Sequence, residues 1–228
     1  MKPKSVFLIV FLLISSFCLS QKEYDFDYLI AYEFTTYEDS VGKTEKVFYL
    51  TNSKKNNYSA LIIEIDSLNY QIDFKDENGL AFNINLLKAD FNNSEFITVH
   101  CDYVRDYHNS FKYLIKDYDF VNLTDTIIER TEYSRYKLTS IKPKKEKRKK
   151  LSTEFYIIDK ETKFHLPLFY IPIAYQEWKS KKNVPNGIFK ERYMIDFYGN
   201  LSFKEKLINY TRIDKKVRIE TGCDNIGE

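Results

Sequence analysis

Hydrophobic and polar residues alternate along most of this chain with a period of two. Successive side chains of a β-strand point to opposite faces of the sheet, so this alternation is typical of a strand with one apolar face. The first run spans eleven residues, and its even positions are all aromatic or aliphatic: Tyr24, Phe26, Tyr28, Ile30, Tyr32 and Phe34. This run predicts a long N-terminal strand.

The same alternation in residues 68–75 and 80–86 predicts a hairpin, because Asp76-Glu77-Asn78-Gly79 lies between the two runs. Asn-Gly is the pair that tight two-residue turns favour. A second turn at Gly199-Asn200 separates the runs 192–198 and 201–213. Further strands are predicted over residues 47–51, 58–65, 96–104, 113–120, 126–141 and 151–158.

Residues 173–182 carry the clearest helix pattern in the chain. They follow Pro172 and end before Asn183 and Pro185, which are helix start and stop signals. Strands at short spacing without helices between them indicate an antiparallel sheet rather than parallel βαβ units. We therefore predict an all-β, mainly antiparallel fold with one or two short helices, in a single domain over residues 21–221.

The N-terminus has the pattern of a secretory signal peptide. Lys2 and Lys4 precede an unbroken apolar run over residues 6–14, and the small residues Ser15, Ser16, Cys18 and Ser20 lie in the stretch that follows. A run of this length is too short to cross a bilayer, which needs about 20 apolar residues. We predict that residues 1–20 form a signal peptide cleaved near Ser20.

Export of the mature chain follows from this interpretation, with the periplasm, secretion or the cell surface as destinations. A lipoprotein site at Cys18 is an alternative, although Phe17 stands where such sites carry a small residue. The longest later apolar stretch, 166–175, is interrupted by Pro167 and Pro172. The sequence therefore predicts no transmembrane segment in the mature chain.

Cleavage would leave two cysteines, Cys101 and Cys223. In an oxidising compartment two cysteines can form one bridge. The alternative is two free thiols, with Cys101 buried and Cys223 in a flexible C-terminal tail over residues 222–228. The sequence leaves both alternatives open.

Charge is balanced overall and concentrated locally. The chain has 35 basic and 33 acidic residues, and without Lys2 and Lys4 the 35 basic residues become 33. This balance excludes a globally basic nucleic-acid binder. Seven cations nevertheless crowd into nine residues, beside the single acid Glu146: Lys142, Lys144, Lys145, Lys147, Arg148, Lys149 and Lys150.

Pro143 disfavours continued strand pairing, so we predict that this basic segment is a long hairpin loop. One interpretation is a solvated loop that blocks aggregation at a sheet edge. The functional interpretation is contact with an anionic envelope surface, such as phospholipid or lipopolysaccharide headgroups.

Candidate catalytic chemistry is sparse. His100, Cys101, Asp102, Asp106 and His108 lie within nine residues and are the residues on which a hydrolase or metal site would depend. Neighbouring strand residues point to opposite faces, which works against such a site. There is no Gly-x-Ser-x-Gly nucleophile turn and no phosphate-binding or dinucleotide motif. The sequence favours a non-catalytic protein and assigns no catalytic residue, metal or cofactor.

Aromatic residues make up 17% of the chain. One dense stretch supplies the candidate ligand-binding residues Phe169, Tyr170, Tyr175 and Trp178. The alternative is that these rings fill a large aromatic core. If these residues do bind a ligand, the segment around Trp178 would cover an apolar cavity inside a curved sheet.

The layout from Asp125 to Pro167 resembles periplasmic lipoprotein-carrier (LolA-like) proteins and related secreted families. The resemblance lies in about 40 residues that read Asp125-Thr126-Ile127-Ile128, Tyr136-Lys137-Leu138, Thr153 to Asp159, and Leu166-Pro167. The chain departs from the pattern at Glu132-Tyr133-Ser134-Arg135, where relatives carry Gly-Tyr-x-Cys, and in its long basic loop. The resemblance implies a curved half-barrel with one or two helices on its concave face, and it transfers no catalytic residue.

These observations predict an exported, non-catalytic protein that binds a hydrophobic or lipidic ligand or the anionic envelope surface. The alternative is a structural or partner-binding surface protein with a filled core, whose protein partner the sequence does not identify. An open apolar cavity would favour the first, and a filled core the second.

Overall fold

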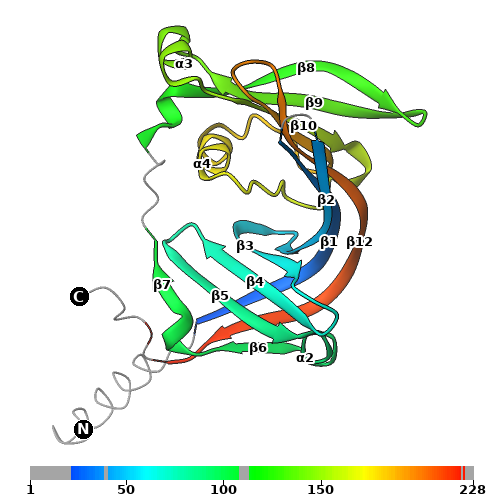
Figure 1. Ribbon diagram of the computed structural model, residues 1–228, viewed down its shortest axis with the longest axis vertical. Helices are drawn as coiled ribbons and strands as arrows, with labels where there is room; N and C mark the ends of the chain where they lie inside the picture. The colour runs from blue at the N-terminus through cyan, green and yellow to red at the C-terminus, as the bar shows by residue number, and fades with distance from the viewer. Residues whose placement is uncertain (1–21, 39–40, 108–112, 222, 224–228) are drawn as a thin grey trace, which may run out of the picture.

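The alternating pattern produces one large twisted sheet (Figure 1). The computed structural model describes residues 22–38, 41–107, 113–221 and 223, so the predicted signal peptide and most of the predicted tail lie outside the described residues. The strands are β1 Lys22–Glu38, β2 Val41–Asn52, β3 Lys55–Glu64, β4 Asn69–Asp76, β5 Leu80–Leu87, β6 Phe96–Val99, β7 Val104–Asp106, β8 Tyr118–Ile128, β9 Thr131–Ser140, β10 Thr153–Asp159, β11 Phe189–Ile195 and β12 Leu201–Ile219.

Strand neighbours follow the order β7-β5-β4-β3-β2-β1-β12-β11-β10-β9-β8, and β6 pairs with the C-terminal part of β12. Every pairing is antiparallel except that of β6 with β12. The twelve-stranded sheet is open and does not close into a barrel. The predicted all-β, mainly antiparallel fold with a curved sheet is therefore confirmed.

Three α-helices occur in the described part of the chain: α2 Lys88–Asn93, α3 Pro143–Lys149 and α4 Pro172–Lys181. Short 3-10 turns add η1 Cys101–Tyr103, η3 Ile115–Asp117 and η4 Lys160–Thr162. Helix α4 is the predicted helix, shifted by one residue. The described part of the chain has three α-helices, one more than the upper number predicted. No helix among the described residues has the length and apolar character that a membrane crossing requires.

Helix α3 corrects the prediction that the basic segment is a loop. The segment does connect β9 to β10, as expected, but seven of its residues are helical. Pro143 stands at the start of the helix, where its missing N–H has no partner to lose, and lysine has good helix propensity. In the sequence, Pro143 was taken as a residue that ends strand pairing. Its preference for the first position of a helix was not considered.

A second correction concerns residues 126–141, which were predicted to form one strand. They belong to two strands, because β8 ends at Ile128 and β9 begins at Thr131. The turn residues Glu129 and Arg130 have φ values of 51° and 72°. Such left-handed turns usually carry Asn-Gly or Asp-Gly, so Glu129-Arg130 is not recognisable as a turn from its residue types.

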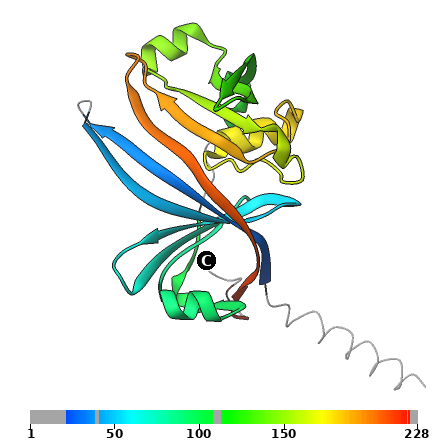
Figure 2. The same cartoon turned by 90° about the vertical axis from the view of Figure 1, so that its right-hand side faces the viewer.

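Two parts of the sheet bury side chains in different cores. In Figure 2, β1 and β12 run through both parts. Strands β3 to β7 and α2 lie at one end, and β8 to β10 with α3 and α4 lie at the other. The register of β1 against β12 shifts between Phe26 and Tyr28. Phe26 belongs to the first core cluster, together with Phe74. A second cluster at the β8–β10 end contains Phe120 and Trp178, and Ile30 belongs to a third cluster.

A disulfide joins Cys101 in η1 to Cys223, with their Cα atoms 5.1 Å apart. The structure therefore has the bridge, one of the two alternatives that the sequence left open. It ties the chain after β12 to the turn between β6 and β7.

Candidate functional site

A groove lies on the sheet face formed by β1, β2, β3, β11 and β12. Residues directly opposite one another on paired strands share a face. Phe34 pairs with Glu45 on one side and with Glu205 on the other, and Val47 pairs with Ile63. The groove has a volume of about 260 Å³ and is lined by Phe34, Glu45, Val47, Tyr49, Leu61, Ile63, Tyr170, Arg192, Phe203 and Glu205.

The size of the groove limits what it can hold. Its 260 Å³ corresponds to eight or nine water molecules at about 30 Å³ each. Pockets that enclose a whole drug-sized ligand are commonly about 300–1,000 Å³. The groove therefore has room for one alkyl segment or one aromatic ring, and the remainder of a larger ligand would stay outside.

The polar part of the groove is a buried ion pair. The Arg192 guanidinium lies 2.9 Å (Nε) and 2.6 Å (Nη2) from Oε2 of Glu205, and both side chains are 4% exposed. The Tyr49 hydroxyl donates to the other Glu205 oxygen at 2.7 Å. Burial raises the pKa of Tyr49, so this hydroxyl stays a neutral donor. The cation of Arg192 is thus already neutralised by Glu205.

A second buried carboxylate, Glu154, lies behind this pair. Its Oε1 is 3.8 Å from Nε of Arg192 and has no hydrogen-bond partner among the described residues, while its Oε2 accepts from the Tyr156 hydroxyl. Burial raises the pKa of Glu154 to about 7, and the Arg192 guanidinium opposes that rise. Two carboxylates share one guanidinium, so the cluster disfavours the entry of a further anion.

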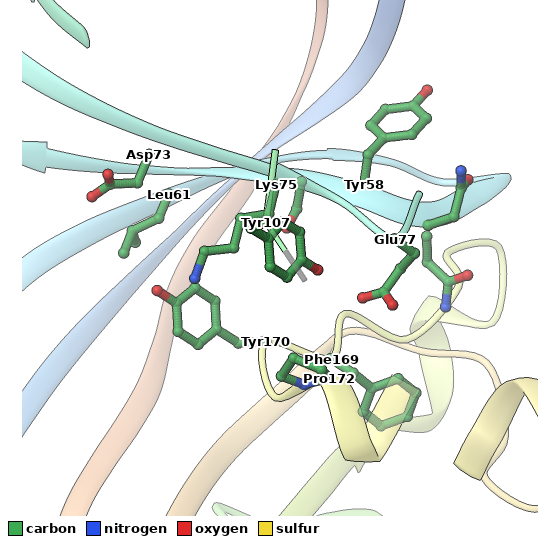
Figure 3. Close-up of a pocket in the computed structure, with 12 residues that line it drawn as sticks. Tyr58, Leu61, Asp73, Lys75, Glu77, Tyr107, Phe169, Tyr170 and Pro172 are labelled. Atoms are coloured by element: carbon green, nitrogen blue, oxygen red, sulfur yellow. The ribbon is translucent and has the colours of Figure 1, made fainter. Parts of the chain in front are cut away.

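Tyr170, in the segment that precedes α4, forms one wall of the groove. It is 39% exposed, and its ring centroid lies 6.3 Å from that of Tyr49 and 5.9 Å from Cζ of Arg192. The ammonium of Lys75 lies 5.0 Å from the same ring (Figure 3). Tyr170 also lines a second, smaller cavity of about 30 Å³, beside Asp73 and Glu77. That cavity has room for about one water molecule.

The four aromatic residues proposed from the sequence do not share one environment. Tyr175 and Trp178 are 4% and 3% exposed in the second core cluster, and Nε1 of Trp178 donates to the carbonyl of Val184 at 3.0 Å. Phe169 belongs to the same cluster and also lines the small cavity. Of the four, Tyr170 lines the larger groove.

Sequence reasoning did not identify Phe34, Ile63, Arg192 or Phe203 as groove residues. The alternation did give the face on which each side chain lies. It did not give the strand neighbours, and the groove depends on β1 lying between β2 and β12.

The cations of the basic segment fall into two groups. Lys145 forms an ion pair with Asp117, and its hydrogen bond holds the pKa of that carboxyl low. The other cations are exposed: Lys142, Lys144, Lys147, Arg148, Lys149 and Lys150.

The cluster considered for metal or hydrolytic chemistry has little in common with such a site. The Cys101 sulfur is in the disulfide and cannot act as a ligand. His100 lies beside the carboxylates of Asp102 and Glu220, at 3.2 and 3.5 Å. His108 lies outside the described residues, and within the described part no group of three or more potential ligands comes together.

No protein-family model matches the chain, and no curated protein matches its sequence. Among solved structures, the MucA/MucB complex from Pseudomonas aeruginosa is similar to 82% of this chain at 7% identity and a TM-score of 0.40. The chain spans about half of that structure's length, 52%.

Two further structures match nearly their full lengths. An outer membrane lipoprotein-sorting protein domain from Vibrio parahaemolyticus has 11% identity and a TM-score of 0.33, with 82% of this chain and 85% of that chain covered. A LolA superfamily protein from Nitrosomonas europaea has 13% identity and a TM-score of 0.32, with 82% and 86% covered. The LolA-like resemblance noted in the sequence thus recurs among solved structures. Similarity of this degree identifies no function.

Proposed function

We propose that this protein, after export, binds the apolar part of an amphiphilic ligand in the groove without catalysing a reaction. The groove carries the proposal: it is an apolar-walled opening of about 260 Å³ beside clusters of buried side chains. A larger hollow of about 570 Å³ has a more polar lining, which includes Asn83, His100 and Glu220, and suits an alkyl chain less well. Phe34, Leu61 and Ile63 are partly buried, so they offer apolar surface to a ligand. The leader-like N-terminus supports export.

The expected strength of binding follows from the size of the groove. Each buried methylene contributes about 0.8 kcal/mol, so six methylenes would contribute about 5 kcal/mol. Association costs at least about 4 kcal/mol in lost translational and rotational freedom. The alkyl part alone therefore gives weak binding, and contacts outside the groove are needed for tight binding.

The ion pair fixes which end of the ligand enters. Because Arg192 is neutralised by Glu205 and lies beside Glu154, an anionic headgroup gains no free cation in the groove. The apolar tail therefore enters, and the charged end remains at the rim. This orientation distinguishes the groove from sites in which a buried arginine binds a carboxylate.

A fluorescent twelve-carbon fatty acid tests the proposal by titration. The variant Ile63→Trp fills the groove and is expected to weaken binding about tenfold, since the loss of two methylene contacts is worth roughly 1.5 kcal/mol. The control Ile127→Trp changes a residue on β8 that is 73% exposed and does not line the groove. Equal affinity for the two variants would contradict the proposal.

Contact with an anionic surface is a second candidate function, favoured by the six exposed cations in and around α3. Sedimentation with phosphatidylglycerol vesicles tests it. The triple variant Lys144→Gln, Lys147→Gln and Lys149→Gln should lose most of its binding, and the wild type should lose it in high salt.

The matched control removes the same charge elsewhere, at the exposed residues Lys43, Lys55 and Lys163. It should bind the vesicles as the wild type does. Equal losses in both triple variants would mean that net charge, and not the basic segment, governs binding.

A further inference from the structure

The turn between β11 and β12 presents two aromatic side chains to solvent. Tyr198 is 65% exposed and Phe197 is 37% exposed, and their ring centroids are 5.5 Å apart. The carboxylate of Asp196 accepts hydrogen bonds at 2.8 Å from the backbone N–H groups of Tyr198 and Asn200. These hydrogen bonds stabilise the conformation of the turn, and both rings are exposed in that conformation.

This turn lies beside the basic helix. The first residue of β10, Thr153, pairs with Ile195 at the end of β11, so the chain leaving α3 enters the sheet next to the turn. The ammonium of Lys150 is 5.1 Å from the centroid of the Tyr198 ring. Figures 1 and 2 both show the tip of the β11–β12 hairpin next to α3 at the same end of the molecule.

We propose that this end of the molecule, made of residues 141–150 and 197–198, docks on a bilayer that contains anionic phospholipid. The inference deepens the second candidate function and rests on it. The cations would meet the headgroups, while Phe197 and Tyr198 enter the interfacial region. Tyrosine and other amphipathic aromatic side chains are enriched at that depth of a membrane.

The apolar side chains argue for a bilayer rather than a free polyanion. A soluble polyanion needs only the cations and would leave the aromatic rings in water. Ile141, immediately before the basic segment, is 49% exposed and adds a third apolar side chain at the same end. Cations interleaved with exposed apolar side chains match a surface that is anionic outside and apolar beneath.

The docking surface lies next to the groove. Phe203 lines the groove and pairs with Met194, and the next pair, Leu201 with Ile195, is the last before the turn. Two residues of a strand span about 7 Å. Docking at the turn would therefore bring one end of the groove close to the membrane surface, where an alkyl tail can pass between bilayer and groove.

The variant Tyr198→Trp tests the depth of contact. With phosphatidylglycerol vesicles its tryptophan emission should shift to the blue and be quenched by lipids with brominated acyl chains. The native Trp178 is 3% exposed and gives a constant background. Inorganic polyphosphate should bind the cations without shifting the emission.

The double variant Phe197→Ser and Tyr198→Ser should weaken vesicle binding about fivefold, which corresponds to roughly 1 kcal/mol, while its salt dependence stays unchanged. The control Leu68→Ser and Leu87→Ser changes exposed apolar residues beside α2, at the other end of the molecule, and should bind as the wild type does. Vesicle binding with unshifted emission of the Tyr198→Trp variant would overturn the inference and leave the second candidate function standing. Absence of any vesicle binding by the wild type would overturn both.

Discussion

Glu154 makes the stability of this protein depend on pH in an uncommon direction. Its pKa rises from an ordinary value of 4.5 to about 7 because the folded protein buries it. Between these values the folded state binds a proton that the unfolded state has released, so stability falls as pH rises. Each pKa unit corresponds to about 1.4 kcal/mol, and the full effect is therefore about 3.5 kcal/mol.

The variant Glu154→Gln removes this titration and keeps a side chain of similar shape. Relative to the wild type, it should gain about 2–3 kcal/mol of stability between pH 5 and pH 8. That is a large part of the 5–15 kcal/mol typical of a folded domain. The gain appears only at the higher pH, because at pH 5 the folded wild type already carries the proton.

Urea unfolding at intervals between pH 5 and pH 8 measures the effect, with free energies extrapolated to water. The difference between the two proteins isolates Glu154, since the other groups titrate in both. Glu33→Gln, on the exposed side of β1, serves as the control and should follow the wild-type curve. A pH-independent difference between Glu154→Gln and the wild type would refute the reasoning.

Three further predictions concern stability. Burial lowers the pKa of His165, so stability should fall as pH drops below about 6.5, and urea unfolding of His165→Asn should lack that slope. The bridge between Cys101 and Cys223 spans 122 residues, and Cys101→Ser with Cys223→Ser should cost about 4–5 kcal/mol in thermal unfolding, while an unchanged melting temperature would argue against the bridge. A Cβ at Gly187 would lie 2.6 Å from Cγ2 of Ile158, at a φ of +152°, so Gly187→Ala should destabilise the fold by about 1–3 kcal/mol. Gly199→Ala should cost less, because Gly199 also has a positive φ, +92°, but its Cβ would meet no described atom within 4 Å.

Local sequence signals predicted the elements that depend on neighbouring residues. The hairpin of β4 and β5 follows from alternation and from Asn78-Gly79, and Gly79 has the positive φ that this pair favours. Helix α4 follows from Pro172 and the helix pattern behind it. The turn at Glu129 and Arg130 escaped prediction because neither residue is typical of left-handed backbone, and the surrounding strand pairing holds it there.

The candidate groove could not be predicted from local sequence signals. Phe34 and Phe203 are separated by most of the chain, yet the pairing of β1 with β12 places them on one face of the sheet, with ring centroids 5.8 Å apart. Arg192, Glu205 and Glu154 look like ordinary strand charges in the sequence. Burial between strands makes them a coupled cluster, with the pKa of Glu154 raised to about 7.

The sequence by itself determined the period of two, and with it the all-β class and the face on which each side chain lies. It also determined where the cations concentrate, because charge is a property of composition and not of folding. The tertiary structure alone decided which strands are neighbours, and so which apolar residues fill a core and which line the groove. The physical reason is that pairing between distant strands depends on the whole set of packing contacts, and no short stretch of sequence contains them.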